Sequence, residues 1–61
     1  MRVCLKKDTE IAGHQLLKHQ EGIVVAITRN VTVDDDYIYI VDIPNIGQLD
    51  IPLSLLDVLR L

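Results

Sequence analysis

The chain has too few cysteines to be held together by disulfide bonds. Its 61 residues include one cysteine, Cys4, so an internal disulfide cannot form. No combination of cysteine and histidine has the spacing of a structural zinc site. A domain of this size buries only about 60% of the surface that its unfolded chain exposes. Stability must therefore come from a tightly packed aliphatic core, from oligomerisation, or from both.

Aromatic residues are scarce as well. Phe and Trp are absent, and the only aromatic side chains are those of Tyr37 and Tyr39. Hydrophobic residues nevertheless make up 49% of the chain, so nearly all of them are Ile, Leu and Val. Because so small a body has little interior, we expect part of this apolar surface to lie exposed or at an interface. The composition therefore favours self-association or a stable protein partner.

The chain also lacks an excess of basic residues. Nine acidic residues outnumber six basic ones, for a net charge of −3, which argues against a surface built to grip phosphates. No apolar run is long enough to cross a bilayer, and no signal peptide follows Met1. With a single thiol, these features predict a cytoplasmic location.

Two neighbouring stretches carry the strongest strand signals. The first, 37–43, combines β-branched residues with both tyrosines, which suits a pleated and half-buried surface. The second, 23–29, is apolar on both faces until Thr28, so we expect a central strand with Ile23, Val25 and Ile27 on one face.

The segment between these two stretches is predicted to reverse the chain. Asn30 suits a bulge or a bend, and 31–33 could extend the earlier strand. The three aspartates at 34–36 predict a turn, because Asp bonds its own backbone and tolerates unusual dihedral angles. The two strands would then form an antiparallel hairpin.

The flanking segments predict shorter elements. A first strand is expected over 3–12, interrupted at Lys7-Asp8 if anywhere and ended by Gly13. The pattern of 14–20 allows either a partly ordered loop or a single helical turn. The turn residues at 44–47 end the strand that contains Tyr37, because Pro44 cannot donate to a β-ladder.

The last part of the chain predicts a short strand, a turn and a terminal element. Alternation of polar and apolar residues over 48–51 indicates a strand with one wet face. A tight turn or one helical turn is expected over 52–57. The final residues, 58–61, suit either a last short strand or the rest of a short helix.

This order of elements predicts an all-β fold in a single domain, residues 1–61. It resembles the small SH3-like barrels, on the matching residues Glu21-Gly22-Ile23-Val24, Tyr39 with Val41, and Ile51-Pro52-Leu53-Ser54-Leu55-Leu56. Stand-alone barrels of this kind include a small accessory protein of photosystem I and the NifZ proteins of nitrogen fixation. The resemblance implies about five short antiparallel strands, a short helical turn before the last strand, and a non-catalytic role as an accessory subunit or docking piece.

A second, narrower resemblance covers residues 47–59. The segment Gly47-Gln48-Leu49-Asp50-Ile51-Pro52-Leu53, with Leu55, Leu56 and Leu59 after it, is similar to a signature of the AbrB/MazE-type swapped-hairpin DNA binders. That resemblance implies an alternative function as a small nucleic-acid-binding transcriptional regulator. The phosphate contacts would then come from Arg2, Lys6, Lys7 and Arg29.

The sequence offers few candidates for catalytic or metal-binding residues. Cys4 and Ser54 have no neighbouring base that would activate either of them as a nucleophile. We therefore expect no enzyme, no catalytic residues and no cofactor. The aspartates at 34–36, with Asp42, lack the alternation of a calcium loop, and we interpret them as a solvated hairpin tip. His14 and His19 are five residues apart and share neither a helix face nor a strand face. We therefore expect no metal site.

The leading functional prediction is a protein-protein interaction module, whose partner is a larger protein or a second copy of the chain. Tyr37 and Tyr39 share a strand face and suit packing across strands or against a partner. Leu16 and Leu17 need burial but lie in a segment with no strong pattern. These four residues are the predicted partner-binding residues.

Overall fold

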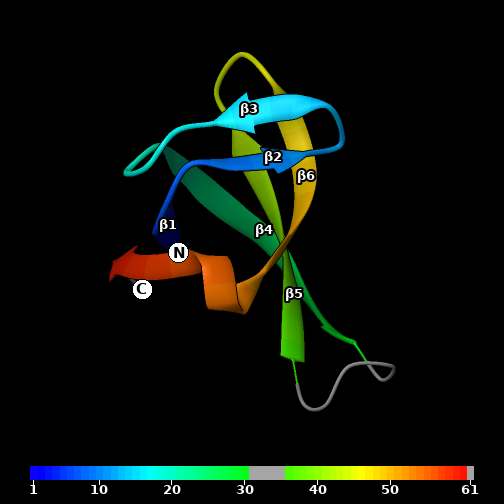
Figure 1. Ribbon diagram of the computed structural model, residues 1–61. Helices are drawn as coiled ribbons and strands as arrows, with labels where there is room; N and C mark the ends of the chain where they lie inside the picture. The colour runs from blue at the N-terminus through cyan, green and yellow to red at the C-terminus, as the bar shows by residue number, and fades with distance from the viewer. Residues whose placement is uncertain (31–35, 61) are drawn as a thin grey trace.

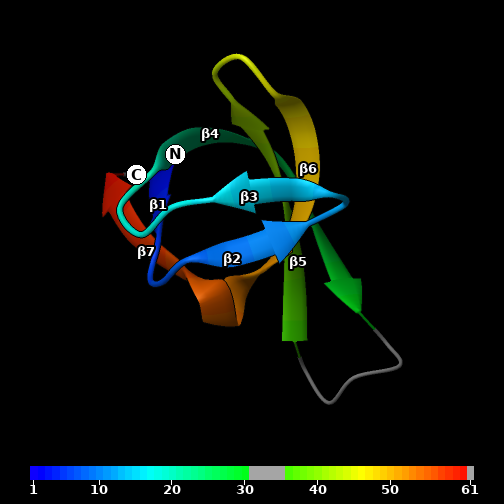
Figure 2. The same ribbon diagram turned by 45° about the horizontal axis from the view of Figure 1, so that its top comes forward.

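A computed structural model describes residues 1–30 and 36–60 of the chain (Figure 1). Its elements are β1 (Arg2–Leu5), β2 (Thr9–Ile11), β3 (His14–Leu16), β4 (Glu21–Asn30), β5 (Asp36–Ile43), β6 (Gly47–Pro52), the 3-10 turn η1 (Leu53–Leu55) and β7 (Leu56–Arg60). Five strands form one antiparallel sheet in the order β6-β5-β4-β1-β7, and β2 pairs with β3 as a separate hairpin. This hairpin lies across the face of the sheet (Figure 2).

The predicted fold class is confirmed. The structure is all-β, its main sheet has five short antiparallel strands, and a short helical turn precedes the last strand. The resemblance to the small SH3-like barrels stays a prediction from the sequence. The hairpin predicted around Tyr37–Ile43 is present as β4 and β5, although 31–33 and the first two aspartates at 34–36 lie outside the described residues.

Two segments differ from the prediction at the N-terminal end. Residues 3–12 are interrupted around Lys7-Asp8, where the sequence allowed a break, but the two pieces do not continue one strand: β1 ends at Leu5, and β2 begins at Thr9 in the other sheet. Residues 14–20 form β3 and a tight turn rather than a loop or a helical turn. The sequence signal was weak there because a three-residue strand shows almost no alternation.

The bulge of β4 lies at a different position from the predicted one. The register shifts between Val24 and Ala26, whereas Asn30 pairs regularly with Asp36. Ile23 pairs with Asp42 before the shift and Ile27 pairs with Tyr39 after it. Asp42 and Tyr39 are three residues apart on β5, so they point to opposite faces. The prediction that Ile23 shares a face with Ile27 is therefore wrong.

The core lies between the sheet and the hairpin, and it is almost entirely aliphatic. In β5, Tyr39, Val41 and Ile43 point inward and are buried, as the alternation of an amphipathic strand requires. Leu49 and Ile51 of β6 continue the same pattern. The remaining buried hydrophobic residues are Val3, Cys4, Leu5, Leu16 and Leu56.

Gly22 allows β4 to pass close to β5. A Cβ atom at this position would lie 2.5 Å from Val41 Cγ1, 2.8 Å from Ile43 Cδ1 and 2.9 Å from the backbone oxygen of Asp42. The side chains of Val41 and Ile43 are fully packed, and the backbone oxygen belongs to the ladder, so none of them can move freely. The glycine is therefore required by packing.

Tight turns join the strands, and three of them use positive φ angles. Pro44 and Asn45 occupy the central positions of a turn closed by a 3.0 Å bond from Ile46 N to Ile43 O, and Asn45 has a φ of 70°. Proline followed by a residue with positive φ is typical of a type II turn. In the β2–β3 hairpin, both central residues are left-handed, with φ angles of 51° at Ala12 and 81° at Gly13.

We expect Gly22→Ala to destabilise the fold by about 3 kcal/mol, because overpacking here forces the backbone of β4 away from β5. Chemical denaturation measures the free energy of unfolding. Gly13→Ala is the control, because nothing lies within 4 Å of its Cβ position and only the backbone strain of about 1–2 kcal/mol applies. Equal losses in the two variants would contradict the close approach at Gly22.

We expect Ala12→Asn to stabilise the fold by roughly 1 kcal/mol. Alanine is strained at a positive φ, whereas Asn-Gly is the preferred pair for a two-residue hairpin loop whose φ angles are both positive. The midpoint of urea denaturation should rise for Ala12→Asn and fall for Ala12→Val, whose branched side chain fits this backbone poorly. An unchanged midpoint in both variants would argue against the left-handed conformation.

Candidate interaction surfaces

The distal half of the β4–β5 hairpin carries an exposed apolar face. It extends beyond the strands that cover the rest of the sheet (Figure 1), because β1 pairs with β4 only over Glu21–Ile23. Ile27 pairs with Tyr39, and the neighbouring pair on the same face includes Tyr37. Side chains two residues apart share a face, which adds Val25. Their exposed fractions are 49% for Val25, 48% for Ile27 and 42% for Tyr37, and we refer to these three residues as the distal apolar face.

The structure divides the predicted partner-binding residues. Tyr37 and Leu17 are exposed, whereas Tyr39 and Leu16 lie in the core. Tyr39 is buried between its two neighbouring strands, where it pairs with Ile27 on one side and Ile51 on the other. Buried side chains offer no surface to a partner, so only Tyr37 and Leu17 remain as contact residues, and they lie on different parts of the molecule.

The four basic residues predicted for nucleic-acid contact are not brought together. Arg2 pairs with Ile23, six residues before Arg29 on β4, and a strand rises about 3.3 Å per residue, so about 20 Å separates the two arginines along the strand. Arg2 forms an ion pair with Glu21, while Lys6 and Lys7 lie just beyond the other end of β1.

Instead, a basic cluster forms from two loops that are distant in sequence. Lys18 lies in the turn after β3, beside the loop after β1 that holds Lys6 and Lys7. A 2.9 Å bond from His19 N to Leu5 O and a 2.8 Å bond from Lys18 N to Asp8 Oδ1 join the two loops. We name Lys6, Lys7 and Lys18 the basic loop cluster. All three are exposed, and no ion pair to a described residue neutralises them.

Sequence reasoning missed Lys18 because its neighbours in space come from another loop. The one feature that could have placed Lys18 beside the other loop was the turn between Leu17 and Gln20 that contains it. Gln20 N donates to Leu17 O over 3.0 Å, and the side-chain oxygen of Gln20 accepts a 2.9 Å bond from Leu17 N. His19 takes a φ of 73°. None of these residue types predicts a turn strongly.

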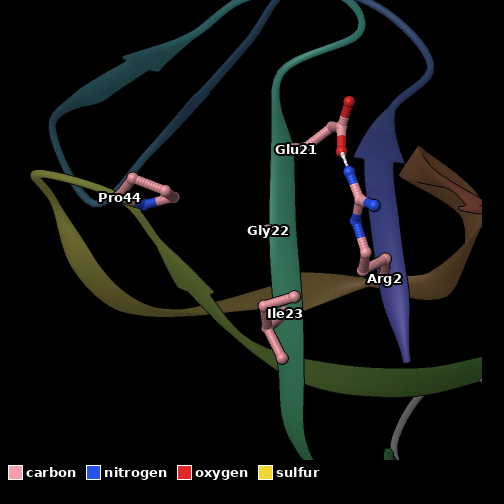
Figure 3. A pocket seen from close by; sticks show the side chains of 5 residues that line it. All are labelled: Arg2, Glu21, Gly22, Ile23 and Pro44. Carbon is pink, nitrogen blue, oxygen red and sulfur yellow. Dashed lines mark hydrogen bonds and ion pairs between the residues drawn. The ribbon is translucent and has the colours of Figure 1, made fainter.

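A shallow pocket lies between the start of β4 and the turn after β5 (Figure 3). It has a volume of about 210 Å³ and is lined by Arg2, Glu21, Gly22, Ile23 and Pro44. The side chains of Arg2 and Glu21 point toward each other along its rim. Because Arg2 and Glu21 pair with one another, the rest of the lining, which is Gly22, Ile23 and Pro44, is apolar.

The remaining candidate groups are dispersed over the described part of the chain. Cys4 is a free thiol and is buried in the core. His14 on β3 and His19 in the following turn are both exposed. Within residues 1–30 and 36–60, no three His, Cys, Asp or Glu side chains come close enough to hold a metal ion. Over the same ranges, no helix has the length and apolar character needed to span a membrane.

Comparisons with known proteins give no relative for this chain: no family model matches it, and no curated protein or solved structure does so either.

We expect Asp8→Ala to lower the free energy of unfolding by about 1 kcal/mol, because the carboxylate accepts a backbone N–H that joins the two loops of the basic cluster. Asp8→Asn keeps an oxygen at this position and should lose less. Hydrogen exchange at the Lys18 amide measures the same bond locally, and it should accelerate in Asp8→Ala. Unchanged exchange at Lys18 would contradict the bond.

Proposed function

We propose that this protein is a non-catalytic interaction module that acts as an accessory subunit and docks on a larger protein through the distal apolar face. The observation that carries the proposal is the exposure of Val25, Ile27 and Tyr37 on one face of a hairpin that extends beyond the core. Three large apolar side chains lie exposed on two adjacent strands, bordered by Arg29, which pairs with Tyr37. Exposed apolar side chains that are grouped in this way mark a contact site more often than scattered residues do.

The shape and chemistry of this face suit a protein partner. Tyrosine combines an apolar ring with a polar hydroxyl, and it loses little conformational entropy when it is buried in an interface. The two strands that carry the face are joined by a β-ladder over their length, so the contact residues are held in place before binding. Preorganisation of this kind reduces the entropic cost of association.

The alternative function, a nucleic-acid-binding regulator, has less support. Nucleic-acid contact requires basic side chains that follow a phosphate backbone. Arg2 and Arg29 lie at distant points of the sheet, and Arg2 is engaged with Glu21. The exposed surface also carries Asp42, Asp50 and Asp57, which would repel a polyanion.

Replacing Tyr37 by a photo-crosslinking phenylalanine derivative tests the proposal directly. Irradiation of a lysate of the native cells, with and without nuclease treatment, should link one protein to position 37 in both samples. Gln48, which is exposed on the opposite face of the molecule's sheet, is the control position and should give no product. Crosslinks that disappear after nuclease treatment would instead favour the regulator.

We expect Ile27→Ser combined with Tyr37→Ala to weaken the complex at least about 30-fold, because the variant removes two central apolar contacts of about 1 kcal/mol or more each. Tyr39 is left intact because its loss would damage the core. Leu59→Ser is the matched control: Leu59 is 49% exposed on β7, outside the distal apolar face. Light scattering after gel filtration identifies whether the partner is a second copy, and an unaffected complex in the double variant would overturn the proposed surface.

A further inference from the structure

The structure contains a second surface with a different chemistry, at the basic loop cluster. Lys6 and Lys7 lie in the loop after β1, and Lys18 lies in the turn after β3. These two connections are on the same side of the molecule in both views (Figures 1 and 2). Half of the six basic residues in an acidic chain therefore gather at one place, with Asp8 as the acidic residue between them.

An exposed apolar side chain accompanies this charge. Leu17 is directly before Lys18 in the turn, and its exposed fraction of 59% is the highest among the large hydrophobic residues described as exposed. Its own backbone N–H is bound to the side chain of Gln20, so the residue is held at the start of the turn. Leucine with this exposure gains free energy when a partner covers it.

The loops are fixed by hydrogen bonds that their backbone N–H groups donate. Lys6 N donates to Leu55 O of η1 over 2.9 Å, and Leu5 N donates to Gln20 O over 3.1 Å. Lys18 N donates to Asp8 Oδ1. Because the backbone positions of the two loops are set before binding, the loops themselves need no further ordering when a partner binds.

We propose that the basic loop cluster binds a short acidic peptide segment of a partner protein, in which an apolar side chain is flanked by carboxylates. The lysines would pair with the carboxylates, and Leu17 would contact the apolar side chain. This proposal rests on the proposed function as an interaction module and names the chemistry of a second contact, separate from the distal apolar face.

A peptide fits this surface better than a nucleic acid. Lysine ammonium groups bind carboxylates and phosphates alike as point charges, so charge alone does not select between them. A nucleic-acid strand bound here would continue over neighbouring surface, where Glu10 and Asp57 are exposed, whereas a short peptide ends within the cluster. Leu17 matches an apolar side chain, and within the described chain no exposed aromatic residue accompanies the lysines to stack on bases.

Fluorescence anisotropy with defined probes tests this inference on the full chain. The probe is a labelled heptapeptide in which glutamates flank two leucines. Binding should weaken as salt rises, because exposed charges are screened. Replacement of the glutamates by lysines should abolish binding, and replacement of the leucines by glycines should weaken it. An oligonucleotide of ten thymidines should bind more weakly than the heptapeptide, and equal or tighter binding would overturn the proposal.

Charge-reversal variants assign the site. We expect Lys18→Glu to weaken peptide binding about fivefold or more, since it replaces an attraction with a repulsion. Arg60→Glu changes the net charge equally at the far end of β7, and it should change the affinity less than about twofold. Asp8→Asn should tighten binding, because it removes the nearby negative charge and keeps the oxygen that joins the loops. Equal effects of Lys18→Glu and Arg60→Glu would show that net charge alone attracts the peptide.

The two functional proposals fail in different ways. Amide chemical-shift changes on peptide addition should centre on residues 5–8 and 17–20. If the peptide shows no binding while crosslinks form at position 37, the inference about the basic loop cluster is wrong and the interaction module stands. If the peptide binds at residues 5–8 and 17–20 but no protein is linked at position 37, the distal apolar face is wrong instead.

Discussion

The close approach of β4 and β5 at Gly22 is the constraint on which the rest of the structure depends. β4 is the one strand of the described sheet that pairs with both β1 and β5, so it joins the two parts of the sheet. The first residues of β4 lie between β1 and β5, and the side chains of Val41 and Ile43 fill the space next to Gly22. Only a residue without a side chain leaves room for this arrangement. β4 pairs with β1 only as far as Ile23, and the register shift before Ala26 follows, so the distal part of the hairpin extends past β1.

The same constraint explains why so much apolar surface stays exposed. A sheet of short strands around a narrow core buries its inward side chains only where a second layer faces them, and the hairpin of β2 and β3 covers only part of the sheet. Beyond that cover, Ile27 and Tyr37 occupy the inward face of the strands, and no element of the described chain buries them. Their exposure is thus a consequence of topology as much as of composition, and a partner is the available source of burial.

The sequence predicted those features that depend on strong local patterns. Strand β5, the turn at Pro44-Asn45 and the wet face of β6 follow from side-chain alternation and turn chemistry. The bulge did not, because the register shift between Val24 and Ala26 depends on pairing with two different strands at once. Burial of Leu16 next to exposed Leu17 could not be read from two adjacent leucines either, since a hairpin of two three-residue strands decides which of them faces the core.

The positions of the charged residues also could not be predicted from local sequence patterns. Grouping by sequence placed Lys6 and Lys7 with Arg2, but Arg2 lies four residues away along an extended strand and is paired with Glu21. The loop that returns to β4 supplies Lys18 instead. The β1–β4 ladder ends at Cys4, and the backbone groups of Leu5 bond to that loop on the same side. Satisfying buried backbone groups thus determines where charge accumulates. In a chain with net negative charge, a cluster held in place by those bonds is a local feature of the fold, and its partner is selected by that local charge rather than by the net charge of the molecule.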